Sequence, residues 1–166
     1  MPAIPRDRFL DAMSRVAATV NVVTTDGPGG RAGVTVSAMT PVSADGAAPT
    51  LLICLHEDSR TTPAIAANRC FCINVLREDQ ASLSDRFAGR APVPGDDKFD
   101  GIATLAMPSG APRLADPLVA FDCALVAGHQ VGTHHIFIGA VTAIHLGEGR
   151  PLLYGNRAYH RPEPAG

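Results

Sequence analysis

The sequence has no cluster of basic residues and no long apolar run. Its 14 Lys and Arg residues are scattered along 166 positions, and the formal net charge is −2. A nucleic-acid-binding protein needs a basic stripe or patch, so this charge pattern excludes that class. The longest apolar runs, such as Leu51–Leu55, are far too short to cross a bilayer. We therefore expect neither a nucleic-acid partner nor a membrane-embedded chain.

A closely spaced cysteine pair and a secretory signal are also missing. Cys54, Cys70, Cys72 and Cys123 form no CxxC motif, which argues against a structural zinc site or a dithiol redox centre. Most of these cysteines lie in apolar, strand-like segments, where reduced thiols pack as small apolar groups. The N-terminal residues contain no apolar signal segment. These features predict a cytoplasmic protein with reduced thiols.

The composition is that of an ordinary globular protein, with 46% apolar and 18% charged residues. A chain of this length can bury a sizeable core. It contains no internal repeat and no linker-like stretch, so we expect residues 1–166 to form a single domain.

The spacing of apolar residues predicts one opening helix followed mainly by strands. Phe9, Met13 and Val16 recur at helical spacing, which predicts a helix over 7–18 with Asp7 as its N-cap. Alternation and short apolar runs then predict strands, the first two of which form a hairpin. The expected strands span residues 19–25, 33–43, 50–56, 70–76, 120–127, 134–146 and 152–154.

Two further short helices are expected, one soon after residue 56 and one over 78–88 that ends at Gly89. Tight turns rather than helical crossovers join the strand pairs, which favours a closed antiparallel barrel over a doubly wound sheet. The loop over 89–101 is long enough to cover a site. The glycines before Gly33 do not form a dinucleotide-binding loop, because such a loop leads into a helix and a strand pattern follows here.

Ser59, Arg60 and Thr61 precede the expected helix after residue 56. Thr62 is a favourable N-cap, and Pro63 suits the first helical position. A helix start points free N–H groups and the positive end of its dipole outward. Two hydroxyl groups and a guanidinium group directly ahead of that end predict a phosphate-binding site. An ordinary capped helix with a solvated arginine is the alternative.

Polar side chains also lie along two of the expected strands. Thr35 and Ser37 share one face of their strand, where hydroxyl groups can bind a flat polar ring or simply face solvent. Asn74 lies near a strand end, where its amide can reach a ligand or stabilise a local turn.

The segment Gly132–His135 places two histidines next to each other on a strand. Adjacent side chains point to opposite faces, so His134 and His135 do not readily chelate one metal ion. We expect no metal site from the 6 scattered histidines, and no acyl-transfer triad, because a Gly-x-Ser-x-Gly motif is missing. No side chain is assigned as a catalytic acid or base. From these residues alone, we expect a β-rich domain, and both a phosphorylated ligand at residues 59–61 and an ordinary capped helix there stay open.

In this order and at these intervals, the segments resemble the short-chain flavin reductase family, which comprises the small reductase components of two-component flavin monooxygenases. The motifs that carry the resemblance are Val22–Thr25, Gly33–Ala38, Ser59–Thr61, Asn74–Leu76, Asp79–Gln80, Gly132–His134 and Tyr154–Tyr159. The resemblance runs from about Phe9 to Tyr159, which is nearly the whole chain.

The resemblance implies a split β-barrel with short peripheral helices that binds FMN or FAD and works as a homodimer. Its activity would be hydride transfer from NADH or NADPH to the flavin, which then passes to a partner flavin-dependent monooxygenase. The residues implied for the flavin ring and ribityl chain are Thr35, Val36, Ser37, Ala38, Asn74, Val75 and Leu76. Those implied for the flavin phosphate are Ser59, Arg60, Thr61 and Gln80. Those implied for the nicotinamide nucleotide are His134, which would position the ring, Tyr154 and Arg157.

This chain departs from the family pattern at two positions. Many relatives have Asp where this chain has Thr133, and Asn where it has His56, so the contacts made there do not carry over. The closest resemblance is to two branches, the reductase of bacterial pyrimidine-ring utilisation and the enzyme that reduces cobalt in corrin biosynthesis. Two other functions stay open: a flavoprotein with tightly bound FMN that reduces another acceptor, such as a cobalt corrinoid, and a flavin-binding module without activity.

Overall fold

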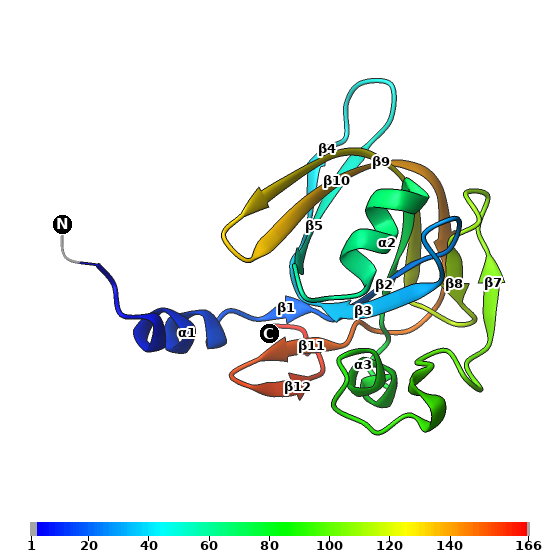
Figure 1. The fold of residues 1–166 in the computed structure, drawn as a ribbon. Coiled ribbons are helices and arrows are strands. Elements are labelled where there is room, and N and C mark those ends of the chain that lie inside the picture. The colour runs from blue at the N-terminus through cyan, green and yellow to red at the C-terminus, as the bar shows by residue number, and fades with distance from the viewer. Residues whose placement is uncertain (1–2, 166) are drawn as a thin grey trace.

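The computed structural model describes residues 3–165 and is built around one large antiparallel sheet (Figure 1). Met1, Pro2 and Gly166, which belong to the expected domain 1–166, lie outside the described residues. The sheet has seven strands in the order β3-β2-β6-β9-β10-β5-β4. In chain order they are β2 (Asn21–Thr25), β3 (Ala32–Val36), β4 (Met39–Ser43), β5 (Thr50–His56), β6 (Cys70–Val75), β9 (Val119–Val131) and β10 (His134–Leu146).

The strand expected over 33–43 is two strands at opposite edges of this sheet. Val36 pairs with Asn21 of β2, whereas Met39 pairs with Ile53 of β5. The chain turns between them at Ser37, whose carbonyl accepts a hydrogen bond from the Met39 N–H at 3.0 Å. Within residues 3–165 no ladder of hydrogen bonds joins β3 to β4. The sheet curls without closing, so the expectation of a closed barrel was wrong, and the mainly β, split architecture is confirmed.

The hairpin of β2 and β3 forms as the sequence predicts, with Thr25 opposite Ala32. Its turn packs against Asn68, at the end of a neighbouring helix. The Asn68 side chain accepts a hydrogen bond from the Gly29 N–H at 2.6 Å and donates one to the Thr25 hydroxyl at 2.9 Å. A Cβ atom on Gly29 would lie 2.7 Å from the Cβ of Ala67. The glycines in this turn therefore allow close packing against a helix rather than phosphate binding.

The opening helix α1 (Arg6–Ser14) is shorter than predicted and begins after Pro5 rather than at an Asp7 cap. Ala18, the last residue of the predicted helix, instead belongs to strand β1 (Ala18–Thr19), which pairs with β11 (Leu153–Gly155). None of its residues is buried, and it projects away from the sheet (Figure 1).

Two other helices pack against the sheet. Helix α2 (Thr61–Asn68) lies inside the curl, where Ile65 is fully buried in the main core cluster (Figure 1). Helix α3 (Ala81–Phe87) ends before Gly89, as predicted, and Gly89 has a φ of 72° that most residues avoid. A short 3-10 turn, η1 (Pro94–Asp96), lies within the loop that follows. No helix among the described residues is long and apolar enough to cross a membrane.

Four short strands complete the structure, three of which the sequence pattern does not predict. They are β7 (Thr104–Ala106), β8 (Pro112–Leu114), β11 and β12 (Ala158–His160). Each has three residues, which is too short for alternation to be visible.

The cysteines are free, and Cys70, Cys72 and Cys123 are buried, whereas Cys54 is partly exposed. Burial, with the Asp122 carboxylate as a second cause, raises the pKa of Cys123 to about 12. Burial also raises the pKa of Cys72 and of Cys54. Because the thiolate is the reactive form, we expect a thiol-reactive chromogenic disulfide at about pH 8 to modify at most Cys54 in the folded protein. Rapid modification of more than one thiol before urea is added would contradict this burial.

Candidate functional site

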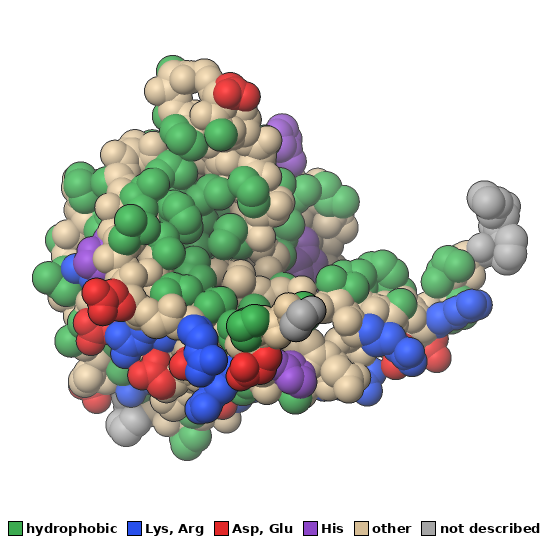
Figure 2. Space-filling view, turned by 180° about the vertical axis from the view of Figure 1, so that it is seen from behind, with side chains coloured by type: hydrophobic (Ala, Val, Ile, Leu, Met, Phe, Trp, Pro, Cys, Tyr) green, Lys and Arg blue, Asp and Glu red, His purple; other side chains and the backbone are tan. Residues whose placement is uncertain are grey.

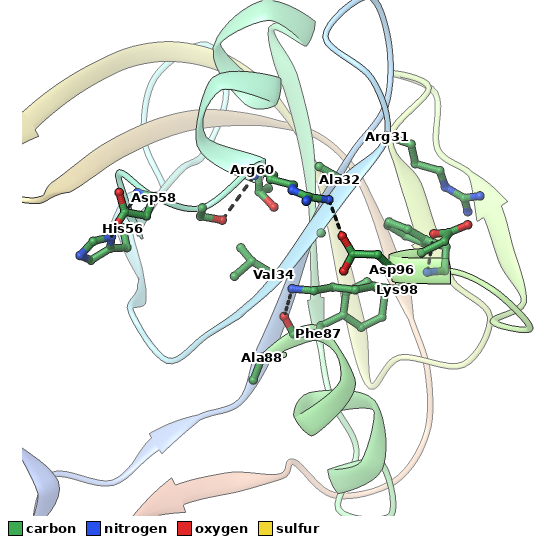
Figure 3. A pocket seen from close by; sticks show the side chains of 15 residues that line it. Arg31, Ala32, Val34, His56, Asp58, Arg60, Phe87, Ala88, Asp96 and Lys98 are labelled. Carbon is green, nitrogen blue, oxygen red and sulfur yellow. Dashed lines mark hydrogen bonds and ion pairs between the residues drawn. The ribbon is translucent and has the colours of Figure 1, made fainter. Parts of the chain in front are cut away.

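A cavity of about 500 Å³ lies between β3, the start of α2 and the end of α3 (Figure 3). Four separate segments of the chain line it. They are residues 31–34, His56 with residues 58–61, residues 87–88, and residues 96–99. The loop over 89–101, which was expected to cover a site, therefore contributes one wall of this cavity.

Ser59, Arg60 and Thr61 all line the cavity, as expected for the predicted phosphate-binding segment. The local geometry differs from the prediction, because Arg60 rather than Thr62 is the N-cap of α2. The Thr62 hydroxyl instead donates to the carbonyl of His56 at 2.8 Å. This bond fastens the end of β5 to the first turn of the helix.

Most N–H groups at this helix start are already bonded or missing. The Thr61 N–H donates to the Ser59 hydroxyl at 3.3 Å, and the Thr62 N–H donates to the Ser59 carbonyl at 3.0 Å. Pro63 has no N–H. The positive end of the helix therefore depends on the Arg60 side chain more than on free backbone groups.

Three cationic side chains surround the cavity, and two of them were not predicted. Arg60 forms an ion pair of 2.8 Å with Asp96, and Figure 3 shows these two side chains pointing toward each other. Lys98 donates to the carbonyl of Phe87 at 2.8 Å, and burial lowers its pKa, with a smaller contribution from Arg60 and an opposing one from Asp96. The Arg31 guanidinium lies 4.1 Å from the centre of the Phe99 ring.

One wall of the cavity is backbone and apolar, and two of the cations contact its aromatic residues. Gly33 lies against Phe87 and Phe99, and a Cβ atom at this position would come within 2.7 Å of the Phe87 ring. Phe87 and Phe99 meet edge to face at 5.1 Å between ring centres. A cavity with an apolar wall and several cationic side chains suits a ligand that has a flat ring and a phosphate group.

Thr35, Val36 and Ser37 do not line this cavity but a smaller, adjacent hollow of about 150 Å³. Ala88 lines both, so the two spaces are neighbours along β3. The Thr35 hydroxyl already donates to the carbonyl of Ser84 at 2.7 Å. Ser37 and Ala38 are exposed at the end of β3.

Asn74, Val75, Leu76 and Gln80 are buried and line neither space. The Asn74 amide donates to the carbonyl of Val22 at 3.0 Å and accepts from the Leu114 N–H at 2.8 Å. Gln80 accepts from the Arg77 N–H at 2.9 Å and donates to the Asp116 carbonyl at 2.8 Å. Their polar atoms are thus used inside the fold. The strand-end position of Asn74 gave no means of telling a ligand contact from these bonds.

His134 lies beside the cavity, through its contact with His56. The two residues are paired across β10 and β5, and their rings meet edge to face at 5.0 Å. Thr133, which departs from the family pattern, places its hydroxyl 3.2 Å from Nδ1 of His134. His135 faces away, as alternation predicts, and stacks on Phe137 at 5.9 Å.

Tyr154 and Arg157 were also implied for the nicotinamide nucleotide, and neither of them lines the main cavity. Tyr154 lines the smaller hollow. Arg157 is 69% exposed and lies 3.9 Å from Asp11 of α1. Among residues 3–165, no group of three or more His, Cys, Asp or Glu side chains is arranged to hold a metal ion.

A curled, mainly β sheet with a cation-lined cavity against one edge is an arrangement that suits a phosphate-bearing ligand. The chain belongs to the flavin reductase like domain family, whose model matches residues 13–163. It is 44% identical over 160 residues to the FMN reductase (NADH) RutF of Methylorubrum extorquens, covering 95% of this chain and 76% of that protein.

Solved structures give the same result. The flavin reductase PheA2 superposes with a TM-score of 0.86 at 30% identity and covers 97% of this chain and 100% of its own. BorF, the flavin reductase component of a bacterial two-component tryptophan halogenase, gives 0.85 at 26% identity and covers 96% and 100%. The family resemblance and the fold class inferred from the sequence are therefore confirmed.

Proposed function

We propose that this chain is an NADH-dependent flavin reductase that reduces FMN and releases it to a partner monooxygenase. The observation that carries the proposal is the cavity at Arg60, in a chain of the flavin reductase family. The relative named FMN reductase (NADH) supports this function over reduction of a cobalt corrinoid. FAD in place of FMN, and NADPH in place of NADH, remain to be compared in the same assay.

The residues of the cavity meet the needs of FMN. Arg60, Lys98 and the Ser59 hydroxyl would hold the phosphate, because they provide positive charge and a donor at one side of the space. Val34 and the backbone of Gly33 would face the ring, with Ser37 and Ala38 just past the end of the same strand. When bound, the flavin accepts a hydride at N5 from C4 of the nicotinamide.

The task of the protein in such a reaction is to align two flat rings. This needs an anchored phosphate and shaped walls rather than a strong acid or base. His134 would orient the nicotinamide carboxamide beside the cavity, and His56 would hold the His134 ring in place through their edge-to-face contact. No proton transfer is assigned to either histidine.

Anaerobic mixing of the purified protein with NADH and FMN tests the function. We expect the flavin absorbance to bleach within seconds, and NADH oxidation to depend on added FMN. A protein that stays yellow through purification and reduces another acceptor without added flavin would contradict release to a partner. Flavin binding without any NADH oxidation would contradict an enzymatic function.

Replacing His134 by Ala should raise the KM for NADH roughly 3- to 10-fold, as expected for the loss of one hydrogen bond, and leave the Kd for FMN within about 2-fold. His135→Ala is the matched control, because the neighbouring ring faces the other side of the strand and stacks on Phe137. Steady-state kinetics and FMN fluorescence titration measure the two constants. A loss of FMN affinity in the His134 variant would overturn its role toward the nicotinamide.

We further propose that the chain works as a homodimer in the cytoplasm. Helix α1 buries none of its residues, and its large apolar side chains Phe9, Leu10 and Met13 are exposed by 57%, 43% and 48%. Figure 2 shows a broad apolar area on the back of the sheet. Exposed apolar side chains on the sheet strands include Val42, Val126, Val131, Ile144 and Leu146. A second copy would cover both surfaces.

The molar mass of the protein in solution, measured by light scattering, tests the dimer directly. Phe9→Glu should shift the population from dimer to monomer, because it places a charge on the apolar face of α1. Arg8→Glu, one residue earlier in the same exposed helix, should leave the dimer intact. A dimeric mass for both variants would show that α1 is not part of the interface. A monomeric mass for the wild type would contradict the dimer itself.

A further inference from the structure

The smaller hollow of about 150 Å³ is a second space with a cationic group, distinct from the one at Arg60. It is bounded by the end of β3, the end of α3 and the C-terminal strands. The residues that line it include Arg90, Tyr154 and Tyr159. Its boundary with the main cavity is Ala88.

The turn that ends α3 aims Arg90 into this hollow. Gly89 adopts a φ of 72°, and the Arg90 N–H then donates to the carbonyl of Asp85 at 2.9 Å. This arrangement is the usual way to reverse the chain after a helix. The Arg90 guanidinium lies 5.5 Å from the centre of the Tyr154 ring and stays 55% exposed.

The neighbours of Arg90 orient it without satisfying it. The ion pair between Arg90 and Asp85 has a separation of 3.6 Å, which is longer than a hydrogen bond. The same Asp85 oxygen accepts a hydrogen bond of 2.7 Å from the Tyr159 hydroxyl. Tyr159 also lies against Tyr154, with ring centres 5.4 Å apart. The guanidinium therefore has donors available in a hollow with aromatic walls.

The proposed reaction has two substrates that carry phosphoryl groups, and FMN has only one such group. If Arg60 and Lys98 hold the FMN phosphate, Arg90 in the neighbouring hollow is available to a different anion. We propose that Arg90 binds a phosphoryl group of the nicotinamide dinucleotide, with Tyr154 and Tyr159 forming the wall beside it. This inference rests on the proposed function and assigns the second substrate to its own subsite.

Arg90→Gln tests the assignment. The variant should raise both the KM for NADH and the Kd for NADH roughly 5- to 20-fold, because a charged hydrogen bond at a half-exposed site is lost. Titration of NADH by its fluorescence, in protein without flavin, gives the Kd apart from turnover. The Kd for FMN should stay within about 2-fold. Arg90→Lys should lose part of the affinity, since it keeps the charge but not the planar fork.

A hydride donor without phosphoryl groups gives the decisive control. With 1-methyl-1,4-dihydronicotinamide and FMN, Arg90→Gln should react at the wild-type rate, which a misfolded or distorted variant would not do. Arg161→Gln is the matched charge control on the surface, because Arg161 is 66% exposed and lines neither space, and it should leave the NADH constants unchanged. Arg60→Gln should show the reverse pattern, with FMN affected and NADH not.

Three results would overturn the inference. They are unchanged NADH constants in Arg90→Gln, a loss of FMN affinity in place of NADH affinity, and an equal loss of rate with the donor that has no phosphoryl group. Failure of the proposed function is a separate result, because the wild type would then show no NADH oxidation with FMN. NADH binding to the flavin-free protein is measured independently of that outcome.

Discussion

Replacing Arg60 by Gln should weaken FMN binding by roughly 1–3 kcal/mol and leave riboflavin binding unchanged. Arg60 is the cation at the start of α2, where most backbone N–H groups are already bonded to Ser59. Its side chain is 85% exposed, so solvent screening favours the lower half of that range. Fluorescence titration with both flavins measures the difference, since riboflavin has the ring and ribityl chain but no phosphate.

Asp96→Asn is the counterpart of this variant. The Asp96 carboxylate now pairs with Arg60 at 2.8 Å, so it competes with a phosphate for the same guanidinium group. Its removal should tighten FMN roughly 2- to 5-fold and again leave riboflavin unchanged. An equal loss of FMN and riboflavin affinity in Arg60→Gln would show that Arg60 shapes the cavity rather than binding the phosphate.

Asn74→Ala should lower the free energy of unfolding by about 2–4 kcal/mol. The side chain is fully buried and satisfies the carbonyl of Val22 and the N–H of Leu114, which belongs to a different sheet. Alanine would leave these groups buried without partners. Urea unfolding followed by circular dichroism measures the loss. In the fraction that stays folded, we expect the Kd for FMN to be close to that of the wild type.

Ser37→Ala should behave in the opposite way, which makes it the matched control. Its side chain is exposed at the end of β3 and lines the smaller hollow, so its removal should leave stability nearly unchanged. A direct contact with the flavin would instead appear as weaker FMN binding. If Asn74→Ala weakened FMN binding while leaving the unfolding midpoint unchanged, the structural role of Asn74 would be wrong.

The elements that local chemistry determines could be predicted from the sequence. The hairpin of β2 and β3 has runs of β-branched residues on both sides of a glycine turn, and α3 ends just before Gly89, which provides a positive φ. The break between β3 and β4 could not be predicted, because no proline or glycine marks it. It arises because Val36 and Met39 find partners on strands at opposite ends of the sheet order. Alternation within one segment contains no information about such distant pairing.

The same distinction applies to the site. Ser59, Arg60 and Thr61 are adjacent in sequence, and the structure places all three on the cavity. Lys98 and Arg31 reach it from segments about 40 and 30 residues away, and nothing in their local sequence indicates a shared wall. Gln80 was implied by resemblance alone, and Asn74 both by resemblance and by its place near a strand end. The side chains of both form bonds inside the fold.

The close approach of Gly33 to Phe87 and Phe99 limits how the cavity can change. Here the strand and the two rings already touch, so the separation between β3 and α3 is at its minimum and the backbone serves as a fixed spacer. Any side chain at position 33 would move α3 away from β3 and widen both the main cavity and the smaller hollow. Altered selectivity for bulkier flavins should therefore arise at Val34 or in the 96–99 loop, where side chains can be exchanged without separating the strand from the helix.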